Sequence, residues 1–147
     1  MIRKALSSDV EQVRICARRA YEKYMARIGR EPAPMVADYE TQIRDGLVWV
    51  SEARDGTVQG FAVFYPRDNH VHLRNLAVAP EHQGNGVGKR LITFCEDTAR
   101  AMGLDAVELY TNLKMTENLS LYPALGYTEI ERRSEDGFER VFFRKTL

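Results

Sequence analysis

One stretch governs the interpretation of this chain: Val78-Ala79-Pro80-Glu81-His82-Gln83-Gly84-Asn85-Gly86-Val87-Gly88-Lys89-Arg90-Leu91. An apolar extended run enters it, three glycines alternate through its turn, and an amphipathic helix follows. Glycine lacks the Cβ that would keep the backbone from curling its N–H groups around an anion. The first turn of a helix adds unpaired N–H groups and the positive end of the helix dipole. The pattern predicts a phosphate-binding turn; the simpler alternative is a tight strand-to-helix turn whose glycines serve sterics alone.

The spacing of the glycines excludes two common phosphate-binding motifs. A P-loop requires Gly-x-x-x-x-Gly-Lys-Ser/Thr, but counting back from Gly88 places Gln83 at the first glycine, and Arg90 replaces the hydroxyl residue. A dinucleotide-binding turn requires Gly-x-Gly-x-x-Gly, and the third glycine is missing whichever glycine starts the count. The pattern that remains is Gln-x-x-Gly-x-Gly at residues 83–88.

This pattern, with its lead-in Val78-Ala79-Pro80, resembles the pyrophosphate-binding loop of the GNAT superfamily of N-acetyltransferases. In that family the loop reads Gln/Arg-x-x-Gly-x-Gly/Ala and follows a strand that ends in an apolar residue, one further residue and proline. The resemblance implies an enzyme that transfers an acetyl group from acetyl-CoA to an amine. It also implies the element order βααβββαβαββ, which the sequence pattern matches from end to end.

Length and composition set further limits. The 147 residues suffice for one domain with its own core, and we expect a single domain over residues 1–147. The 21 basic and 21 acidic residues cancel, so no global charge draws the protein to nucleic acid or membrane. No apolar run approaches the roughly 18 residues of a membrane span. Cys16 and Cys95 form neither a disulfide framework nor a metal site. We expect a soluble, cytoplasmic protein without a metal.

The N-terminal half predicts a strand, two helices and three further strands. Residues 2–5 form the first strand, and Ser8-Asp9-Val10-Glu11 is a capping box that starts a helix ending at Gly29. A second short helix is expected over 38–44. Strands at 47–52, 58–65 and 70–78, joined by short turns, are expected to pair antiparallel.

The C-terminal half predicts a crossover unit and a hairpin. Apolar residues at helical spacing run from the glycine turn to Gly103, and a strand follows at 105–110. Strand, crossover helix and strand give two parallel strands. A short helix at about 116–125 and strands at 127–133 and 138–145 complete the chain. We therefore expect one α/β (α+β) domain with a mixed sheet of about seven strands.

The resemblance implies where the donor lies. Coenzyme A would sit between the two parallel strands, which splay apart, and its pantetheine arm would pair with the main chain of Leu76, Ala77 and Val78 like an added strand. The pyrophosphate would meet the N–H groups of the turn, which belong to Gln83, Gly84, Asn85, Gly86, Val87, Gly88 and Lys89. Two or three charge-assisted hydrogen bonds of about 1.5–3 kcal/mol each explain a usable affinity. Lys89 and Arg90 either add positive charge there or are solvated residues at a helix start.

A second family signature lies in residues 118–127. The family pattern is Asn…Tyr-x-x-x-Gly-Phe/Tyr, and the resemblance implies that Asn118 contacts the cofactor arm while the Tyr122 hydroxyl lies by the thioester sulfur. The two residues are four apart and share a helix face. Pro123 departs from the pattern and is expected to kink or restart the helix. Tyr122 is our candidate general acid, because a phenol and a thiol differ in pKa so little that the proton transfer costs only about 2 kcal/mol.

The general base is less defined. His72 precedes Val78 by six residues, and strict strand alternation would place both on one face. A pKa near 6.5 suits a histidine for accepting an amine proton. Glu52 and Glu108 are alternatives, and His72 is equally well explained as a hydrogen-bonded or surface histidine. Backbone N–H groups near 76–78 could polarise the thioester carbonyl. Cys95 lies deep in its helix, where apolar neighbours raise a thiol pKa, so an acetyl-cysteine route is not expected.

The acceptor site is the least determined part. The resemblance implies that it is formed by the first two helices, their link and the last hairpin, roughly residues 131–139. The candidate substrate-contacting residues are Arg27, Arg30, Glu31, Met35 and Tyr39. An amino acid, a polyamine conjugate, an antibiotic amine and a protein N-terminus all remain open. The resemblance allows a homodimer. The alternative to an enzyme is a non-catalytic acyl-CoA-binding or regulatory module with the same fold.

Overall fold

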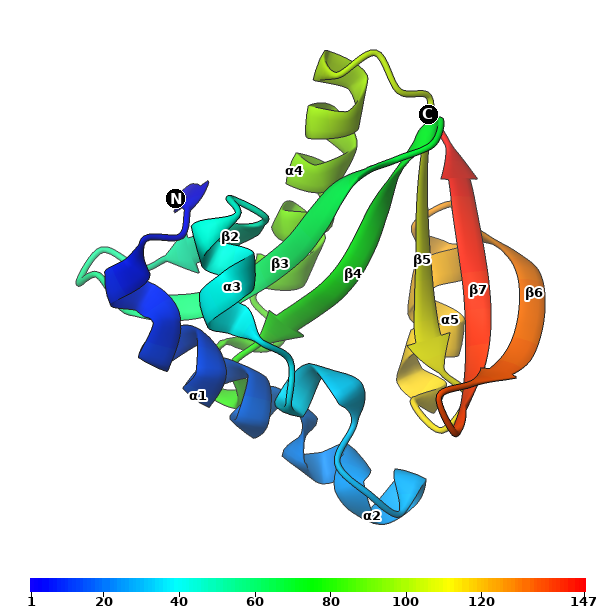
Figure 1. Ribbon diagram of the computed structural model, residues 1–147, viewed down its shortest axis with the longest axis horizontal. Coiled ribbons are helices and arrows are strands. Elements are labelled where there is room, and N and C mark those ends of the chain that lie inside the picture. Colours follow the sequence, from blue (N-terminus) through cyan, green and yellow to red (C-terminus); the bar gives the residue numbers. More distant parts are fainter.

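A computed structural model describes residues 1–147, and its centre is one seven-stranded mixed sheet with the strand order β1-β2-β3-β4-β5-β7-β6 (Figure 1). All neighbouring strands are antiparallel except β4 and β5. The strands are β1 (Ile2–Lys4), β2 (Val48–Glu52), β3 (Val58–Arg67), β4 (His70–Val78), β5 (Ala106–Asn112), β6 (Thr128–Glu135) and β7 (Phe138–Thr146). The α/β class, the seven strands and the parallel pair are confirmed.

Five α-helices flank the sheet. They are α1 (Val10–Tyr21), α2 (Met25–Ile28), α3 (Tyr39–Arg44), α4 (Val87–Ala101) and α5 (Thr116–Ala124). Short 3₁₀ turns lie at Ser7–Asp9, Glu22–Tyr24, Ala33–Met35 and Pro80–His82. The helical segment predicted to end at Gly29 does end there, because Gly29 takes a left-handed conformation with φ 88°.

The start of that segment differs from the prediction. Ser8 does not cap a helix; it lies inside a 3₁₀ turn, and the capping carboxylate is that of Asp9, which accepts the Leu6 N–H at 2.7 Å. Arg3 donates two hydrogen bonds to the same carboxylate, at 2.8 and 3.0 Å. The charged carboxylate of Asp9, which is paired with Arg3, is a stronger hydrogen-bond acceptor for the Leu6 N–H than a serine hydroxyl would be.

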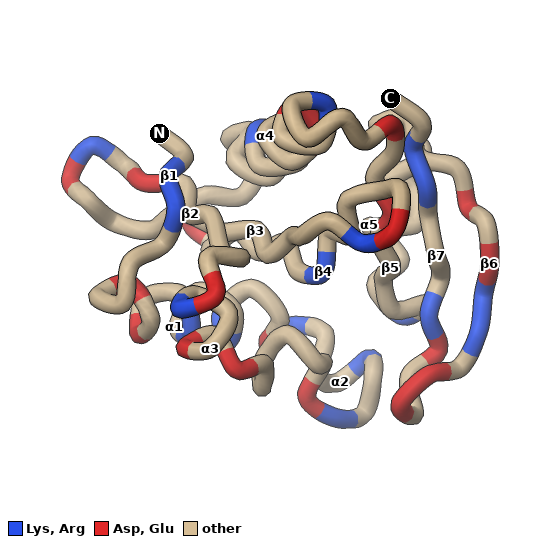
Figure 2. Tube along the Cα trace, turned by 45° about the horizontal axis from the view of Figure 1, so that its top comes forward, with Lys and Arg blue, Asp and Glu red and all other residues tan.

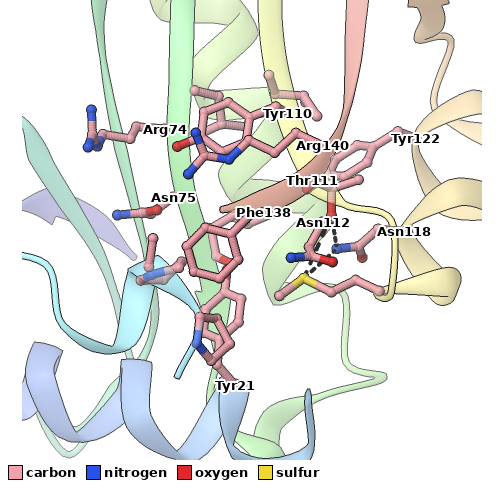
Figure 3. Close-up of a pocket in the computed structure, with 17 residues that line it drawn as sticks. Tyr21, Arg74, Asn75, Tyr110, Thr111, Asn112, Asn118, Tyr122, Phe138 and Arg140 are labelled. Carbon is pink, nitrogen blue, oxygen red and sulfur yellow. Dashed lines mark hydrogen bonds between the residues drawn. The ribbon is translucent and has the colours of Figure 1, made fainter. Parts of the chain in front are cut away.

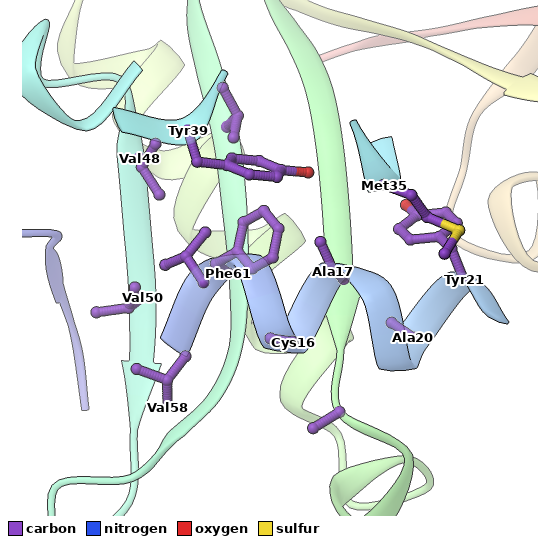
Figure 4. Close-up of a cluster of buried hydrophobic side chains, with 14 of the residues drawn as sticks. Cys16, Ala17, Ala20, Tyr21, Met35, Tyr39, Val48, Val50, Val58 and Phe61 are labelled. Carbon is purple, nitrogen blue, oxygen red and sulfur yellow. The ribbon is translucent and has the colours of Figure 1, made fainter. Parts of the chain in front are cut away.

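The two faces of the sheet carry separate hydrophobic cores. On one face α1 and α3 pack over β2, β3 and the end of β4, where Tyr39 meets the edge of Phe61 with ring centroids 5.2 Å apart (Figure 4). On the other face α4 and α5 pack against the strands through Leu91, Tyr122 and Phe143. Cys16 lies in the first core and Cys95 in the second, and burial raises the pKa of both thiols.

The parallel strands stay together only at their beginnings. Residues Val71–Leu73 of β4 pair with Val107–Leu109 of β5, and no pairing between the strands continues beyond them. Figure 1 shows β4 and β5 diverging from this point, with β5 held by β7 instead. The splay implied by the family resemblance is therefore present.

A β-bulge at Arg74 changes which side chains share a face of β4. Opposite β3, Val63 pairs with Asn75 and Phe64 with Leu73, so Arg74 is an extra residue. Leu73 packs in the α4-side core, and beyond the bulge so do Leu76 and Val78. An inserted residue reverses the alternation along a strand.

The surface carries both signs of charge. Figure 2 shows basic and acidic residues interspersed along the chain, most densely on the outer hairpin, where nearly all of β6 is exposed. None of the helices combines the length and apolar character that crossing a membrane would require.

Candidate functional site

Three adjoining pockets run through the splay from one face of the sheet to the other. The first holds about 560 Å3 of empty space, counting its open mouth, and lies between β4, β5, the 32–34 link and the β6–β7 hairpin. The second lies between α1 and α5, and the third surrounds the glycine turn. Tyr21, Leu76, Asn118 and Tyr122 line both the first and the second pocket. The pockets therefore form one route from the hairpin side to the glycine turn.

The glycine turn presents a row of unused N–H groups to the third pocket. Gly84 and Gly86 have φ of 82° and 80°, conformations that favour glycine. The first hydrogen bond of α4 runs from the Arg90 N–H to the Gly86 carbonyl, and no N–H of residues 84–89 donates within the chain. Gly88 does not have a positive φ, and a Cβ at this position would make only an ordinary 3.5 Å contact with Val78.

Gln83 has a different place in the turn from the one predicted. Its N–H donates to the Pro80 carbonyl at 3.3 Å, so it is not free for a ligand. Its side-chain Nε2 donates to the Val78 carbonyl at 3.1 Å. Gln83 thus ties the turn to the end of β4, while the free N–H groups begin at Gly84.

The open edge of β4 is formed by Leu76 and Val78. The Ala79 N–H donates to Gln59 of β3, so by alternation Ala77 also faces β3, and the N–H and C=O groups of Leu76 and Val78 face the splay. Tyr21 donates its hydroxyl to the Leu76 carbonyl at 2.6 Å, and Gln83 covers the Val78 carbonyl. What this edge still offers a ligand is a pair of N–H donors.

Helix α5 places Asn118 and Tyr122 on the opposite wall. Asn118 donates to Thr111 Oγ1 at 3.0 Å, as the dashed lines of Figure 3 show, and this bond fixes its amide. Tyr122 packs against Tyr127 and Phe143, with ring centroids 5.8 and 5.7 Å away. Its hydroxyl has no partner within the chain and borders the pocket, and burial raises its pKa.

Pro123 does not break α5. The helix continues through it to Ala124, and the Tyr127 N–H bonds back to the Tyr122 carbonyl at 3.0 Å. A proline near the end of a helix removes only one hydrogen bond of the helix, the one to the carbonyl four residues before it. The predicted restart of the helix at Pro123 was wrong, and Asn118 and Tyr122 lie four residues apart on one continuous helix.

The hairpin side of the splay is built from side chains. Tyr110, Phe138 and Arg140 come from β5 and β7, and Arg74 and Asn75 come from the bulge of β4. The Arg140 guanidinium lies 4.3 Å from the centre of the Tyr110 ring, and Figure 3 shows the two side chains beside each other. Burial of Arg140 is nearly complete. Phe138 falls within the hairpin range 131–139 that the sequence analysis assigned to the acceptor site, and the other four were not predicted there; the one available signal was a polar Asn75 inside an apolar strand.

The predicted acceptor residues divide into surface and core. Arg27 is exposed and pairs with Glu117 at 2.5 Å, and Glu31 is exposed without a hydrogen bond. Arg30 stacks over Phe138 at 3.7 Å, at the rim of the first pocket. Met35 and Tyr39 are buried in the α1-side core and line none of the pockets. Their positions assign these two to packing, because the 3₁₀ turn at 33–35 directs its prolines, not Met35, to the pocket.

His72 does not reach the splay. The bulge places it on the face opposite Val78, so the predicted shared face was wrong. Its ring lies between those of Tyr65 and Tyr110, at 5.5 and 5.8 Å, and it lines none of the three pockets. Burial, with the nearby positive side chains of Arg67 and others, lowers its pKa to about 4.

The alternative bases are also occupied elsewhere. Glu52 pairs with Arg3, and Glu108 pairs with Arg144 and lies 3.7 Å from His70. Neither lines the first pocket, whose wall contains no aspartate, glutamate or histidine.

The donor implied by the sequence fits these residues. Unpaired N–H groups at 84–89 suit the oxygens of a diphosphate at a helix start. The free N–H groups of Leu76 and Val78 suit the amide carbonyls of an extended arm laid along the strand edge. The arm would end between Asn118 and Tyr122, where the pockets meet.

Comparison with known proteins agrees. Residues 13–127 match the Acetyltransferase (GNAT) family. The curated relatives include an IAA acetyltransferase of Azospirillum brasilense, 24% identical over 74% of this chain and 72% of its own length. Another is a probable N-acetyltransferase family 8 member 5 of Mus musculus, 28% identical over 84% of this chain. The aligned part is about half, 56%, of the mouse protein.

Solved structures share the fold. A PaiA N-acetyltransferase of Thermoplasma acidophilum in complex with coenzyme A superposes with a TM-score of 0.74, at 21% identity, over 100% of this chain and 98% of that one. Members of the matched family use acetyl-CoA as the acetyl donor. The match extends from α1 through the glycine turn to the end of α5, so it includes every donor-side element described above. The chain therefore belongs to the Acetyltransferase (GNAT) family and is an acetyltransferase domain.

Proposed function

We propose that this domain transfers the acetyl group of acetyl-CoA to the primary amine of a small molecule, by direct attack while both substrates are bound. The proposal rests on one observation: Asn118 and Tyr122 lie where the second pocket, between α1 and α5, meets the first pocket on the hairpin side. Two substrates that enter from opposite faces would meet beside them. No cysteine lies there to carry the acetyl group, since both are buried in the cores.

The chain's own residues have distinct parts in this proposal. Bound acetyl-CoA supplies the activated thioester. The N–H groups on the open edge, at Leu76 and Val78, hold the donor and can stabilise charge on the carbonyl oxygen. As the N–C bond forms and the C–S bond breaks, Tyr122 gives its hydroxyl proton to the sulfur.

Burial of Tyr122 is compatible with this role. The raised pKa keeps the phenol protonated at neutral pH, ready to donate. The same apolar surroundings also raise the proton affinity of a thiolate formed beside it, so the two pKa values move together.

The acceptor's proton has no side-chain base to receive it in the pocket. The titratable groups of the wall are two arginines and three tyrosines, Arg74, Arg140, Tyr21, Tyr110 and Tyr122. Positive neighbours lower the pKa of an ammonium group and favour the neutral amine. We therefore propose that the amine loses its proton to water at the pocket mouth, and that His72 does not act as the base.

Thermal melting and CoA release test the proposal. At about one hundred times its Kd, acetyl-CoA should stabilise the protein by about 2.7 kcal/mol, a shift of several degrees, while ATP and NAD should not. CoA release should depend on added amine, with an N-acetylated product in equal amount. Stabilisation by acetyl-CoA without transfer to any of a broad panel of amines would instead favour a non-catalytic acyl-CoA-binding module.

A further inference from the structure

We propose that the acceptor is an amine that also carries a carboxylate, such as an α-amino acid, and that Asn75 and Arg74 bind this carboxylate. The inference rests on the proposed function, because it concerns the acceptor half of the same site. It names two residues of the β4 bulge as determinants of acceptor specificity.

The first argument is the charge of the wall. The first pocket is lined by Arg74 and Arg140 and by no acidic side chain. Glu135 and Asp136 pair with Arg140 at 2.5 and 3.5 Å and compensate its charge. Arg74 has no carboxylate partner; its one side-chain hydrogen bond goes to the Tyr65 hydroxyl at 3.5 Å. A positive charge thus remains available to an anion.

The rim adds to this balance. Arg30 stacks on Phe138 and donates to the Asp136 carbonyl at 2.6 Å, without an ion pair of its own. Glu31 is the exposed carboxylate next to it in the chain. The three carboxylates around the site therefore match its three arginines in number, and Arg74 is the lining arginine that has no carboxylate partner. A polycation would gain nothing on such a wall.

The second argument is the state of Asn75. This residue is only 7% exposed, yet its side chain makes no hydrogen bond within the chain. Its amide atoms are not completely enclosed, and Asn75 lines the first pocket. The amide therefore has hydrogen-bonding capacity that no group within the chain uses, and a ligand with a matching acceptor can take it up. The amide NH₂ donates readily to a carboxylate oxygen.

The third argument is that the bulge brings the two side chains to one pocket. Consecutive residues of a regular strand point to opposite faces, but Arg74 and Asn75 project from the same side of β4 in Figure 3. A guanidinium beside an amide offers a planar set of N–H donors to a carboxylate. The rest of the wall, at Pro32–Pro34 and Phe138, is apolar and suits a short apolar side chain.

Matched acceptors test the inference. CoA release is measured with three sets of amines, each an amino acid with its amide and its decarboxylated amine. The amino acids are phenylalanine (with phenylalaninamide and phenethylamine), methionine and leucine. In at least one set the carboxylate form should exceed the other two by about tenfold or more in kcat/KM, the scale of one charge-assisted hydrogen bond. The Arg74→Gln variant should lose that preference through KM.

A second variant adds a negative charge at the proposed carboxylate site without changing the shape of the side chain. Asn75→Asp breaks no hydrogen bond within the chain and should shift the preference from the carboxylate form to the amide or amine form. Arg18→Gln is the matched control, since Arg18 is exposed on α1 and lines none of the pockets. It should leave every ratio unchanged. Circular dichroism and melting confirm that each variant is folded.

A binding measurement separates the two proposals. In the presence of CoA, 3-phenylpropionate, which has no amine, should raise the melting midpoint of the wild type and of Arg18→Gln but not of Arg74→Gln. Such protection without acetylation of any amine would support the carboxylate site and contradict the proposed function. Transfer that prefers amines without a carboxylate would overturn the inference and leave the function standing. Absence of both effects would overturn both.

Discussion

The proposed donor half and the proposed acceptor half of the site present different kinds of groups to a ligand. Around the glycine turn and the edge of β4, the groups that face the pocket are backbone N–H groups at 84–89, Leu76 and Val78. On the hairpin side they are side chains, such as Asn75 and Arg140. A backbone recognises what every acyl-CoA has in common, a diphosphate and amides. Side chains select among acceptors, and they can change without disturbing the strands.

The largest effect should come from the residue at the boundary. Tyr122→Phe removes the proposed acid while keeping the ring packed against Tyr127 and Phe143. We expect kcat to fall about 10²–10³-fold, the usual scale for an acid–base group, with acetyl-CoA affinity almost unchanged. Steady-state kinetics and calorimetric titration measure the two quantities. Wild-type turnover in the variant would make Tyr122 a packing residue.

The next effect tests the backbone half alone. Gly86→Val places a branched side chain at φ 80° and brings a Cβ to 3.1 Å from Arg90 Nη1. Strain of about 1–3 kcal/mol, with displacement of the turn, should weaken acetyl-CoA binding about 100-fold. The melting midpoint without ligand should stay within a few degrees. Unchanged affinity for acetyl-CoA in calorimetry would remove the turn from the donor site.

A milder change at the same turn sharpens this test. Gly84→Ala adds a Cβ that meets nothing within 4 Å, so the cost is that of φ 82° alone. About 1 kcal/mol of strain should weaken acetyl-CoA binding about fivefold. A loss of acetyl-CoA affinity as large as that of Gly86→Val would show that the positive φ, rather than a steric contact of the added side chain, determines whether the turn binds. Titrations on the two variants under one buffer give the comparison.

The smallest effect on turnover is expected at His72. His72→Gln should change kcat/KM less than threefold, because the ring lies outside the pockets. A large loss of kcat/KM with an altered pH profile would contradict this expectation and restore His72 as the base.

The same variant should change stability in acid. The folded-state pKa of His72 is about 4, below the usual 6.5, so the unfolded chain binds more protons between these values. The stabilisation, on the order of 3 kcal/mol, is complete above pH 6.5 and is lost as pH falls toward 4. In His72→Gln that part of the acid sensitivity should disappear. Denaturant melts at pH 7.0 and 4.5 measure the difference.

The geometry of the proposed donor half could be predicted from the sequence because its determinants are local. Glycine spacing, a helix start and a strand before them fix where the N–H groups lie, whatever packs around them. Asn118 and Tyr122 followed from the same resemblance and from helix periodicity. Even there, the sequence could not show that Gln83 donates its backbone N–H to Pro80 and its side-chain amide to Val78.

Only part of the proposed acceptor half could be predicted: the link and the hairpin expected there do reach the pocket, through Pro32–Pro34 and Phe138, but the β4 wall depends on one irregularity. Period-two alternation assigned His72 to the face of Val78, and the single extra residue at Arg74 reversed that assignment. Bulges carry no strong sequence signal. Tyr39 was placed in the acceptor site by its position in the link, but its ring fills the core against Phe61. The hairpin contributes Phe138, which lies within the predicted range 131–139, and Arg140, which lies one residue beyond it.

The extra residue in β4 also constrains what mutations the chain can tolerate. Deleting Arg74 would restore regular pairing with β3 and rotate one half of the strand by a full side-chain step. If the first half of the strand rotated, His70 and His72 would enter the hydrophobic core beneath α4 while Val71 and Leu73 turned away from it. If the second half rotated, the segment that leads into the glycine turn would present its other face to that core. A β4 strand that is one residue shorter therefore cannot place its apolar side chains correctly in both hydrophobic cores, so the fold depends on the length of β4.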